Sequence, residues 1–286
     1  MLTDLDALHD FLDAHPRLFV LTGAGCSTES GIPDYRDEDG AWKRRQPVQY
    51  FDFVRRPEVR QRYWARSFAG WPRFAEARPN GAHLALAGLQ AAGRLHCLVT
   101  QNVDGLHQRA GSRDVIDLHG RLDTVQCLTC HASQPRDDFQ EALAAANPAW
   151  PAPRAMAAPD GDADLEGADY ASFIVPDCPT CAGILKPAVV FFGESVPPDR
   201  VAVCLDRLGM ADALLVVGSS LMVRSGYRFA LAAHERGIPV AALNRGRTRA
   251  DDLLALKVEG NCADILGKLV FGHTEETETK RCVQRT

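Results

Sequence analysis

The chain has 286 residues, of which 46% are hydrophobic, and its 32 basic side chains stand against 37 acidic ones for a net charge of −5. This length supports one large core, or one core with a smaller satellite domain. A net negative chain offers no broad positive field for a phosphate backbone, so nucleic acid is not expected as a partner.

The N-terminus and the cysteines favour a reducing compartment. Residues 1–23 carry acidic side chains and lack the basic and apolar segments of a secretory signal. No stretch holds the roughly 18 consecutive apolar residues that a membrane-spanning helix needs, so no membrane association is expected. The nine cysteines are an odd number, and four of them form two Cys-x-x-Cys pairs, a spacing that suits metal better than disulfides. We therefore expect a cytoplasmic protein.

Helical patterns and short apolar runs alternate along the chain. Helices are predicted over residues 3–15, 80–93 and 224–236, and strands over residues 17–22, 95–100, 114–118, 189–192, 213–217 and 238–243. This alternation predicts an α/β fold with a Rossmann-like, doubly wound, mostly parallel sheet and helices on both faces.

Two stretches interrupt the alternation, and we interpret them as an inserted small domain. Residues 36–78 are rich in arginine and aromatic side chains and look helical, and residues 121–187 contain the cysteine pairs and a Pro/Ala/Asp-rich loop. The Rossmann-like domain would then comprise residues 1–35, 79–120 and 188–272. Residues 273–286 have no apolar periodicity, which predicts a mobile tail.

A glycine-rich turn follows the first predicted strand, with the sequence Gly23-Ala24-Gly25-Cys26-Ser27-Thr28. Two glycines at this place let backbone N–H groups approach a pyrophosphate at a helix N-terminus, which favours a dinucleotide. Thr28 stands where the dinucleotide fingerprint has its third glycine, and no strand-end acidic residue follows about 20 positions later. A tight structural turn is the alternative interpretation.

The two cysteine pairs have the spacing of a zinc site. They are Cys127 with Cys130, and Cys178 with Cys181. Four thiolates at this spacing close a tetrahedral site around Zn²⁺ and leave no open catalytic position. The alternatives are buried free thiols or redox chemistry.

Polar residues gather at two predicted strand ends. Gln101-Asn102-Val103-Asp104 follows the strand that ends at residue 100, and His119 follows the strand that ends at residue 118. Both ends open onto the ligand crevice of a doubly wound sheet, where a histidine can act as a general base. The alternative for His119 is a structural role in a loop.

These features, taken with further motifs, resemble the sirtuin family. The motifs are GAGCSTESGIPDYR at 23–36, TQNVDGLH at 100–107, DLHG at 117–120, the cysteine pairs, LKPAVVFFGESVP at 185–197 and VVGSSLMV at 216–223. The resemblance runs from about residue 17 to residue 270. The stretches RQRYWARSFAGWP, GSRDVIDLHG, SGYRF and TRADDLLALK are most similar to the class II branch that includes the mitochondrial sirtuin four.

The resemblance implies an NAD-dependent deacylase of acylated lysine in proteins. The enzyme would release nicotinamide and transfer the acyl group to ADP-ribose, with His119 as general base and Asn102 and Asp104 as further catalytic residues, while zinc stays structural. The NAD contacts it implies are Gly23, Ala24, Gly25, Ser27, Thr28, Pro33, Asp34, Tyr35, Arg36, Gln101, Asn102, Val103, Asp104, Gly218, Ser219, Ser220, Asn244, Arg245, Gly246 and Cys262.

The same resemblance implies where the substrate binds. The peptide would be gripped as an added β-strand between two edges, one formed by Phe192, Gly193 and Glu194 and the other by Val223. One departure from the family pattern is Ser225, where many relatives have proline.

A tyrosine and an arginine in the first insertion bear on the acyl group. Tyr63 and Arg66 lie about one helical turn apart, and a similar pair serves sirtuins that remove acidic acyl groups. An arginine in a dry pocket would pair with the carboxylate of a succinyl, glutaryl or methylglutaryl chain. The alternatives are a surface ion pair or core packing.

Three other functions are compatible with parts of the sequence. The first is protein mono-ADP-ribosyl transfer from the same NAD site. The second is hydride transfer by a Rossmann dehydrogenase, against which the altered glycine fingerprint argues. The third is a zinc-ribbon binding module without turnover, for which the polar strand-end residues would be needless.

Overall fold

The computed structural model describes residues 4–43, 47–150, 156–157, 163–164 and 169–271. The predicted mobile tail, residues 273–286, lies outside these ranges, as does most of the predicted Pro/Ala/Asp-rich loop.

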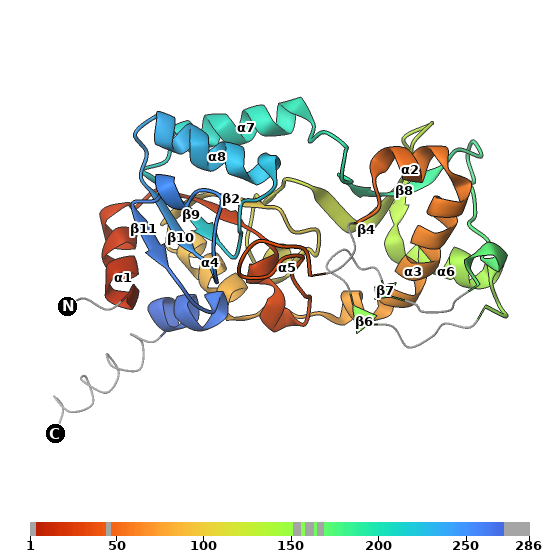
Figure 1. The fold of residues 1–286 in the computed structure, drawn as a ribbon, viewed down its shortest axis with the longest axis horizontal. Helices are drawn as coiled ribbons and strands as arrows, with labels where there is room; N and C mark the ends of the chain where they lie inside the picture. Colours follow the sequence, from red (N-terminus) through yellow and green to blue (C-terminus); the bar gives the residue numbers. More distant parts are fainter. Residues whose placement is uncertain (1–3, 44–46, 151–155, 158–162, 165–168, 272–286) are drawn as a thin grey trace, which may run out of the picture.

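A six-stranded parallel sheet forms the larger part of the molecule (Figure 1). In spatial order its strands are β11 (Leu256–Val258), β10 (Val240–Leu243), β9 (Ala213–Val217), β1 (Leu18–Thr22), β2 (Leu95–Thr100) and β3 (Ile116–Asp117). Every residue of β1 and β9 is buried, and both strands are continuously apolar apart from Thr22. Such runs are typical of strands covered on both faces.

Helices cover both faces of this sheet. On one face α1 (Asp4–Ala14), α4 (Gly81–Ala91) and a helical stretch over residues 262–271 pack against one set of alternate strand side chains. On the other, α7 (Pro198–Gly209) and α8 (Arg224–Glu235) pack against the opposite set. At roughly 1.5–3 kcal/mol for each buried aliphatic side chain, these two clusters provide the main driving force for folding.

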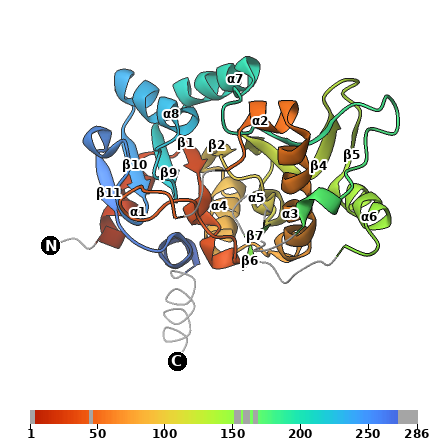
Figure 2. The same ribbon diagram turned by 45° about the vertical axis from the view of Figure 1, so that its right-hand side comes forward.

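A smaller lobe lies at the carboxyl end of the sheet (Figures 1 and 2). Its three-stranded antiparallel sheet has the order β5 (Ser133–Pro135), β4 (Gly120–Cys127), β8 (Leu185–Val189). Around it lie α2 (Tyr50–Arg55), α3 (Pro57–Glu76), α6 (Arg136–Ala146), η3 (Tyr170–Ser172) and the pair β6 (Met156–Ala157) and β7 (Ala163–Asp164). Trp64 and Phe139 are central to its separate core, with ring centroids 4.7 Å apart.

The predicted fold class is confirmed, including the smaller lobe that carries the four cysteines. The predicted helix at 80–93 is α4, which begins with a capping box: Asn80 Oδ1 accepts from the Ala82 N–H at 2.9 Å, and the Asn80 N–H donates to His83 Nδ1. The helical character predicted for residues 36–78 holds for α2 and α3.

One predicted strand was wrong in place and partner. The strand expected over residues 189–192 runs from Leu185 to Val189, and it pairs antiparallel with β4 rather than joining the parallel sheet. Residues 190–193 instead contact other segments around the site, as the isolated bridge between Gln49 and Phe192 shows. The predictions also omitted α7, β4 and β11.

Among the described residues, no helix is both long enough and apolar enough to cross a membrane.

Candidate active site

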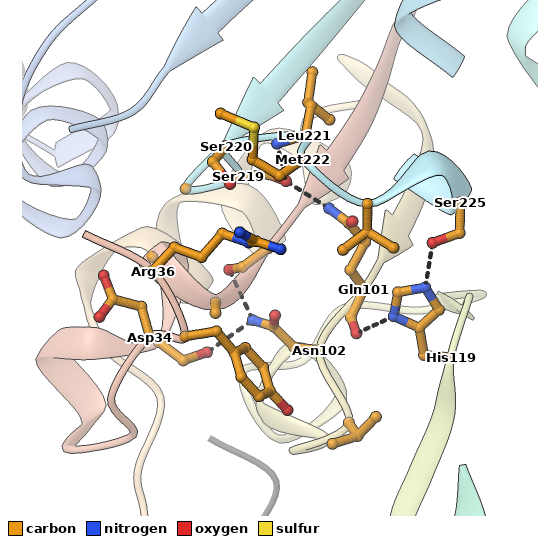
Figure 3. Close-up of a pocket in the computed structure, with 18 of the residues that line it drawn as sticks. Asp34, Arg36, Gln101, Asn102, His119, Ser219, Ser220, Leu221, Met222 and Ser225 are labelled. Carbon is orange, nitrogen blue, oxygen red and sulfur yellow. Dashed lines mark hydrogen bonds between the residues drawn. The ribbon is translucent and has the colours of Figure 1, made fainter. Parts of the chain in front are cut away.

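A cavity of about 1040 Å³ lies between the parallel sheet and the smaller lobe. Segments that follow β1, β2, β9 and β10 line it from one side, and residues of α3, β4 and β8 line it from the other. This is the carboxyl edge of a parallel sheet, where open α/β folds bind their ligands. Figure 3 shows part of this cavity.

The glycine-rich turn after β1 forms one wall of the cavity. It continues into two short 3₁₀ turns, η1 (Ala24–Cys26) and η2 (Thr28–Ser30), and not into the long helix that the dinucleotide fingerprint would place there. Its anion-binding capacity therefore depends on individual backbone N–H groups and not on a helix macrodipole.

The glycines allow this turn to touch the turn after β9. The Gly25 N–H donates to the Gly218 carbonyl at 2.8 Å. Gly218 has φ +62°, and a Cβ atom added there would lie 2.2 Å from the Cys26 nitrogen. A Cβ at Gly23 would lie 2.7 Å from Cβ of Ser219. Side chains at either place would force the two turns apart.

The polar loop after β2 is hydrogen-bonded to the glycine-rich turn. Asn102 Nδ2 donates to the Gly23 carbonyl and to Ser27 Oγ, both at 3.0 Å (Figure 3). Ser27 Oγ in turn donates to Asp104 Oδ2 at 2.7 Å, and Asp104 Oδ1 accepts from the Leu106 N–H at 2.9 Å. Burial raises the pKa of Asp104, and these hydrogen bonds partly oppose that rise.

Gln101 connects three segments at the same edge. Its Nε2 donates to Ser219 Oγ at 2.7 Å and to the Thr22 carbonyl at 3.3 Å. The side chain therefore joins the ends of β1, β2 and β9, and its own backbone carbonyl faces His119 (Figure 3).

His119 lies between β3 and β4, where the larger sheet passes into the smaller lobe. Its Nδ1 is 2.9 Å from the Gln101 carbonyl oxygen and its Nε2 is 2.8 Å from Ser225 Oγ. The pKa of the imidazole is lowered to about 4, chiefly by burial; the bond to Gln101 opposes this change, and the charges of Arg200 and Arg228 add to it. The imidazole is therefore neutral at pH 7 and can accept a proton.

Two further histidines lie behind the glycine-rich turn. His107 Nε2 is 2.9 Å from Thr22 Oγ1, and His83 Nε2 is 3.4 Å from Ser27 Oγ. The two rings are 4.7 Å apart, and burial lowers the pKa of His83 to about 4 and that of His107 well below its usual value. With buried Cys26 they form a second group of possible metal ligands, but each imidazole already has a hydrogen-bond partner in the turn or in β1.

Hydrogen bonds and an ion pair hold the segment over residues 192–194 in place. The Phe192 carbonyl accepts from the Tyr50 N–H at 2.8 Å. Glu194 forms a 3.1 Å ion pair with Lys186, whose pKa is lowered by burial, and it also accepts from the Phe191 N–H at 2.9 Å. The Glu194 carboxylate thus supports the loop by internal bonds.

An aromatic wall borders the same segment. The rings of Tyr35, Trp42 and Phe192 pack edge to face with centroids 5.6–6.1 Å apart, and the Arg36 guanidinium lies 4.0 Å from the Trp42 ring centre. Tyr35, Arg36 and Phe192 were predicted site residues, but Trp42 was not. Its role depends on how the loop after the glycine-rich turn folds back, which local sequence patterns do not reveal.

The predicted tyrosine and arginine of the first insertion have different environments. Both lie on α3, and Tyr63 is buried, lines the cavity, and packs against Phe53 and Phe191 with ring centroids 5.3 and 5.2 Å away. Arg66 is half-buried and is not among the residues that line the cavity.

The four predicted zinc ligands come together at the far end of β4. Their sulfur atoms all lie within 4.8 Å of one another, with 3.5 Å between Cys127 and Cys181 and 3.7 Å between Cys130 and Cys178. The Cys130 backbone N–H lowers the pKa of Cys127 to about 6. Four sulfur donors at this spacing fit a tetrahedral Zn²⁺ site. His119 and Cys127 lie at opposite ends of β4, at most roughly 26 Å apart along the chain at about 3.3 Å a residue.

Most of the predicted NAD and substrate residues share one cavity. Those that line it are Gly23, Ala24, Gly25, Ser27, Thr28, Asp34, Tyr35, Arg36, Tyr63, Gln101, Asn102, Val103, Asp104, His119, Phe192, Gly193, Glu194, Gly218, Ser219, Ser220, Val223, Asn244, Arg245 and Cys262. Pro33 and Gly246 lie beside lining residues without lining the cavity themselves.

The chain matches one family model and many known proteins. The family model, described as Sir2 family, matches residues 23–225. An NAD-dependent protein deacetylase 2 of Bradyrhizobium diazoefficiens is 62% identical over 264 residues, which are 92% of this chain and 97% of that protein. The NAD-dependent protein lipoamidase sirtuin-4, mitochondrial, of Bos taurus is 52% identical over 262 residues, or 91% of this chain and 83% of that protein.

Solved structures of Sir2 proteins are also similar to this chain. A structure described as Sir2-p53 peptide-NAD+ has a TM-score of 0.74 at 29% identity and covers 93% of this chain and 96% of its own. A crystal structure of a Sir2 homolog–NAD complex has a TM-score of 0.71 at 32% identity, covering 95% and 94%.

Proposed function

The chain belongs to the Sir2 family, and we infer that it is an NAD-dependent protein-lysine deacylase. The observation that carries this inference is the convergence of the glycine-rich turn, the polar loop after β2 and His119 on one cavity. The relatives' names are those of deacetylases and a lipoamidase, so the mono-ADP-ribosyltransferase alternative is not favoured.

NAD is a substrate that the reaction consumes. In our proposal the glycine-rich turn binds the pyrophosphate, and Asn102 and Asp104 orient the nicotinamide ribose beside it. The acyl-lysine carbonyl oxygen then attacks the anomeric carbon of that ribose. The glycosidic C–N bond breaks, nicotinamide leaves as a neutral molecule, and an alkylimidate remains. The residues around the ribose contribute by holding the two reactants in line and stabilising positive charge at the anomeric carbon.

His119 acts in the second half of the reaction. Its neutral imidazole accepts the proton of a ribose hydroxyl, and the oxygen attacks the imidate carbon. The C–N bond to lysine then breaks as the amine takes the proton from His119, and water adds to the acyl carbon of the cyclic cation that remains. Cleavage of the bond between that carbon and the anomeric oxygen leaves the acyl group on the attacking ribose oxygen. The overall reaction converts NAD, acyl-lysine and water into nicotinamide, free lysine and O-acyl-ADP-ribose.

The substrate is an acylated lysine presented by a protein. The edges at Phe192–Glu194 and at Val223 support this proposal because both line the cavity. Main-chain hydrogen bonds to such edges bind many sequences with similar affinity. One similar structure is a complex described as Sir2-p53 peptide-NAD+, which is consistent with a protein substrate for this family.

Zinc has a structural role in the proposal. Cys127, Cys130, Cys178 and Cys181 would hold one Zn²⁺, which would pin the end of β4 to the turn before β8. Because these thiols must stay reduced to bind the metal, we place the protein in a reducing compartment such as the cytoplasm.

The division into two domains is also part of the proposal. Residues 1–35, 79–120 and 188–272 would form the NAD-binding domain, and residues 36–78 and 121–187 the small one. The separate buried clusters of the parallel sheet and of the smaller lobe support this division.

Release of nicotinamide tests the proposed function. The purified protein is incubated with NAD and one lysine peptide that is either acylated or unmodified, and nicotinamide is quantified by chromatography. We expect release that depends on the acyl group. Equal release with both peptides, or none with any of a set of acyl groups, contradicts the proposal.

The acyl preference needs a separate test, because Tyr63 lines the cavity and Arg66 does not. Acetyl, lipoyl, succinyl, glutaryl and methylglutaryl peptides are compared in the wild type, Arg66→Gln and the control Arg73→Gln, an exposed arginine on the same helix. An arginine that pairs with the acyl carboxylate predicts a tenfold or larger loss for the acidic acyl groups alone in Arg66→Gln. If Arg66→Gln ranks the five acyl groups as the wild type does, Arg66 has a packing role.

A further inference from the structure

The lone pair of the proposed general base is covered by a serine hydroxyl. Ser225 Oγ lies 2.8 Å from His119 Nε2, and Figure 3 shows the imidazole held between Ser225 on one side and the Gln101 carbonyl on the other. Ser225 is the second residue of α8, whereas His119 precedes β4, so the contact joins segments 106 positions apart in the chain.

The partners of His119 fix its tautomer. A carbonyl oxygen has no proton to give, so the 2.9 Å contact with Gln101 requires a proton on Nδ1. In the neutral imidazole Nε2 is then the unprotonated nitrogen. The Ser225 hydroxyl must therefore donate its proton toward Nε2, the atom that has to accept the ribose proton in the proposed reaction.

The charged groups near His119 do not provide Nε2 with a favourable partner, so the hydrogen bond from Ser225 is its main favourable polar contact. Arg200 of α7 donates to the Leu118 carbonyl at 3.1 Å, and Arg228 of α8 lines the cavity. Both cations disfavour a charged imidazole. Asp117 accepts from Gln108 at 3.0 Å and so has a partner of its own.

We propose that Ser225 is a positioning residue for acyl transfer, which holds the His119 imidazole with Nε2 toward the cavity and yields its place to the ribose hydroxyl when NAD is bound. This role rests on the proposed deacylase function. A serine hydroxyl leaves by rotation about one side-chain bond, without movement of the helix. When the ribose O–H bond then breaks, its proton goes to Nε2, while the other proton stays on Nδ1, which donates it to the Gln101 carbonyl.

In this role Ser225 affects only the second half of the reaction, which is acyl transfer. Departure of nicotinamide does not need a base, but attack of the ribose hydroxyl does. Loss of the Ser225 hydroxyl leaves the imidazole held only by its bond to the Gln101 carbonyl and opens Nε2 to water. Because a donor to Nε2 stabilises the neutral ring, its loss also raises the pKa of His119.

The test compares Ser225→Ala, Ser225→Thr and the remote control Ser172→Ala, whose hydroxyl makes one hydrogen bond to the Asp169 carbonyl. Exchange of labelled nicotinamide into NAD reports the first half of the reaction, and single-turnover formation of O-acyl-ADP-ribose reports the second. Both are measured between about pH 3.5 and 9 with one acetyl-lysine peptide, and thermal midpoints at each pH confirm folding.

In Ser225→Ala we expect acyl transfer to slow by roughly three- to tenfold, a rise in the ratio of exchange to transfer, and an acidic limb shifted to higher pH. Ser225→Thr, which keeps the hydroxyl, should restore transfer to within about twofold. Unchanged transfer and an unchanged acidic limb in Ser225→Ala overturn the role of Ser225 alone. A wild-type protein that shows neither exchange nor transfer overturns the deacylase function and this role with it.

Discussion

Ser27 donates a hydrogen bond of 2.7 Å to the carboxylate of Asp104, and this bond joins the glycine-rich turn after β1 to the polar loop after β2. The two segments are 77 positions apart in the chain. Since both line the cavity, the bond holds together two walls of the site in which NAD is proposed to lie.

Replacement of Asp104 by alanine should weaken NAD binding. The change leaves Ser27 Oγ and the Leu106 N–H without their shared acceptor, and an unpaired buried donor costs roughly 1–3 kcal/mol. We expect the dissociation constant for NAD, measured by calorimetry, to rise about five- to 150-fold. Asp123→Ala, which removes a half-exposed carboxylate from β4, is the control and should bind NAD like the wild type. Equal affinity of the two variants would count against the proposed NAD contact.

A methyl group at Gly218 should separate the two turns that hold the pyrophosphate. Its Cβ would lie 2.2 Å from the Cys26 nitrogen, and φ at this residue is +62°. We expect Gly218→Ala to lose NAD binding by at least tenfold and to unfold at lower temperature than the wild type. Gly237→Ala is the matched control, because Gly237 also has positive φ (+69°) but its added Cβ meets no atom within 4 Å. If the two variants bind NAD with equal affinity, NAD binding does not depend on the close approach of the two turns.

Metal analysis of the purified protein should find one zinc per chain. Cys181→Ser should lower zinc content and the thermal midpoint together, because one of four sulfur donors is lost. Cys204→Ala, which removes a buried thiol of α7 outside the cluster, should keep its zinc. A strong chelator should abolish nicotinamide release only to the extent that it unfolds the wild type. Loss of release in a protein that stays fully folded without zinc would assign the metal a catalytic role.

Acid should destabilise the protein through its buried histidines. Burial lowers the pKa of His83 and of His119 from 6.5 to about 4. Above pH 6.5 these rings are neutral in both states, and below it the unfolded chain takes up protons that the folded chain refuses. The free energy of unfolding should therefore fall between pH 6.5 and about 4, by roughly 1 kcal/mol per pH unit for each ring.

Urea titrations at pH 7.5, 6.5, 5.5 and 5.0 measure this slope. His83→Gln should reduce it, whereas His234→Gln, which changes an exposed histidine, should not. A slope that is the same in all three proteins would show that other groups cause the acid sensitivity.

Local sequence patterns predicted the helices and strands whose formation depends mainly on their own residues. The continuously apolar strand at residues 213–217 and the helix at residues 80–93 were predicted because their pattern of apolar residues appears in the residue order itself. The four cysteines were predicted as a cluster because their spacing has few other uses. The NAD residues came largely from family resemblance, and their convergence on one cavity agrees with it.

Contacts between distant segments could not be predicted in this way. The pairing of β8 with β4, and not with the parallel sheet, depends on the long connection between the cysteine pairs. Trp42 joins the aromatic wall through a loop that folds back on Phe192. The bond from Ser225 to His119 needs both α8 and β4 in place, and neither residue carries a local signal for the other.

The most direct test of the account is mass spectrometry of the wild type and His119→Ala, each incubated with NAD and an acylated lysine peptide. For the wild type we expect the peptide to lose its acyl mass while O-acyl-ADP-ribose appears in equal amount, and for His119→Ala we expect neither product above about 1% of that amount. An unchanged peptide together with ADP-ribose attached to protein, or full deacylation by His119→Ala, would contradict the account.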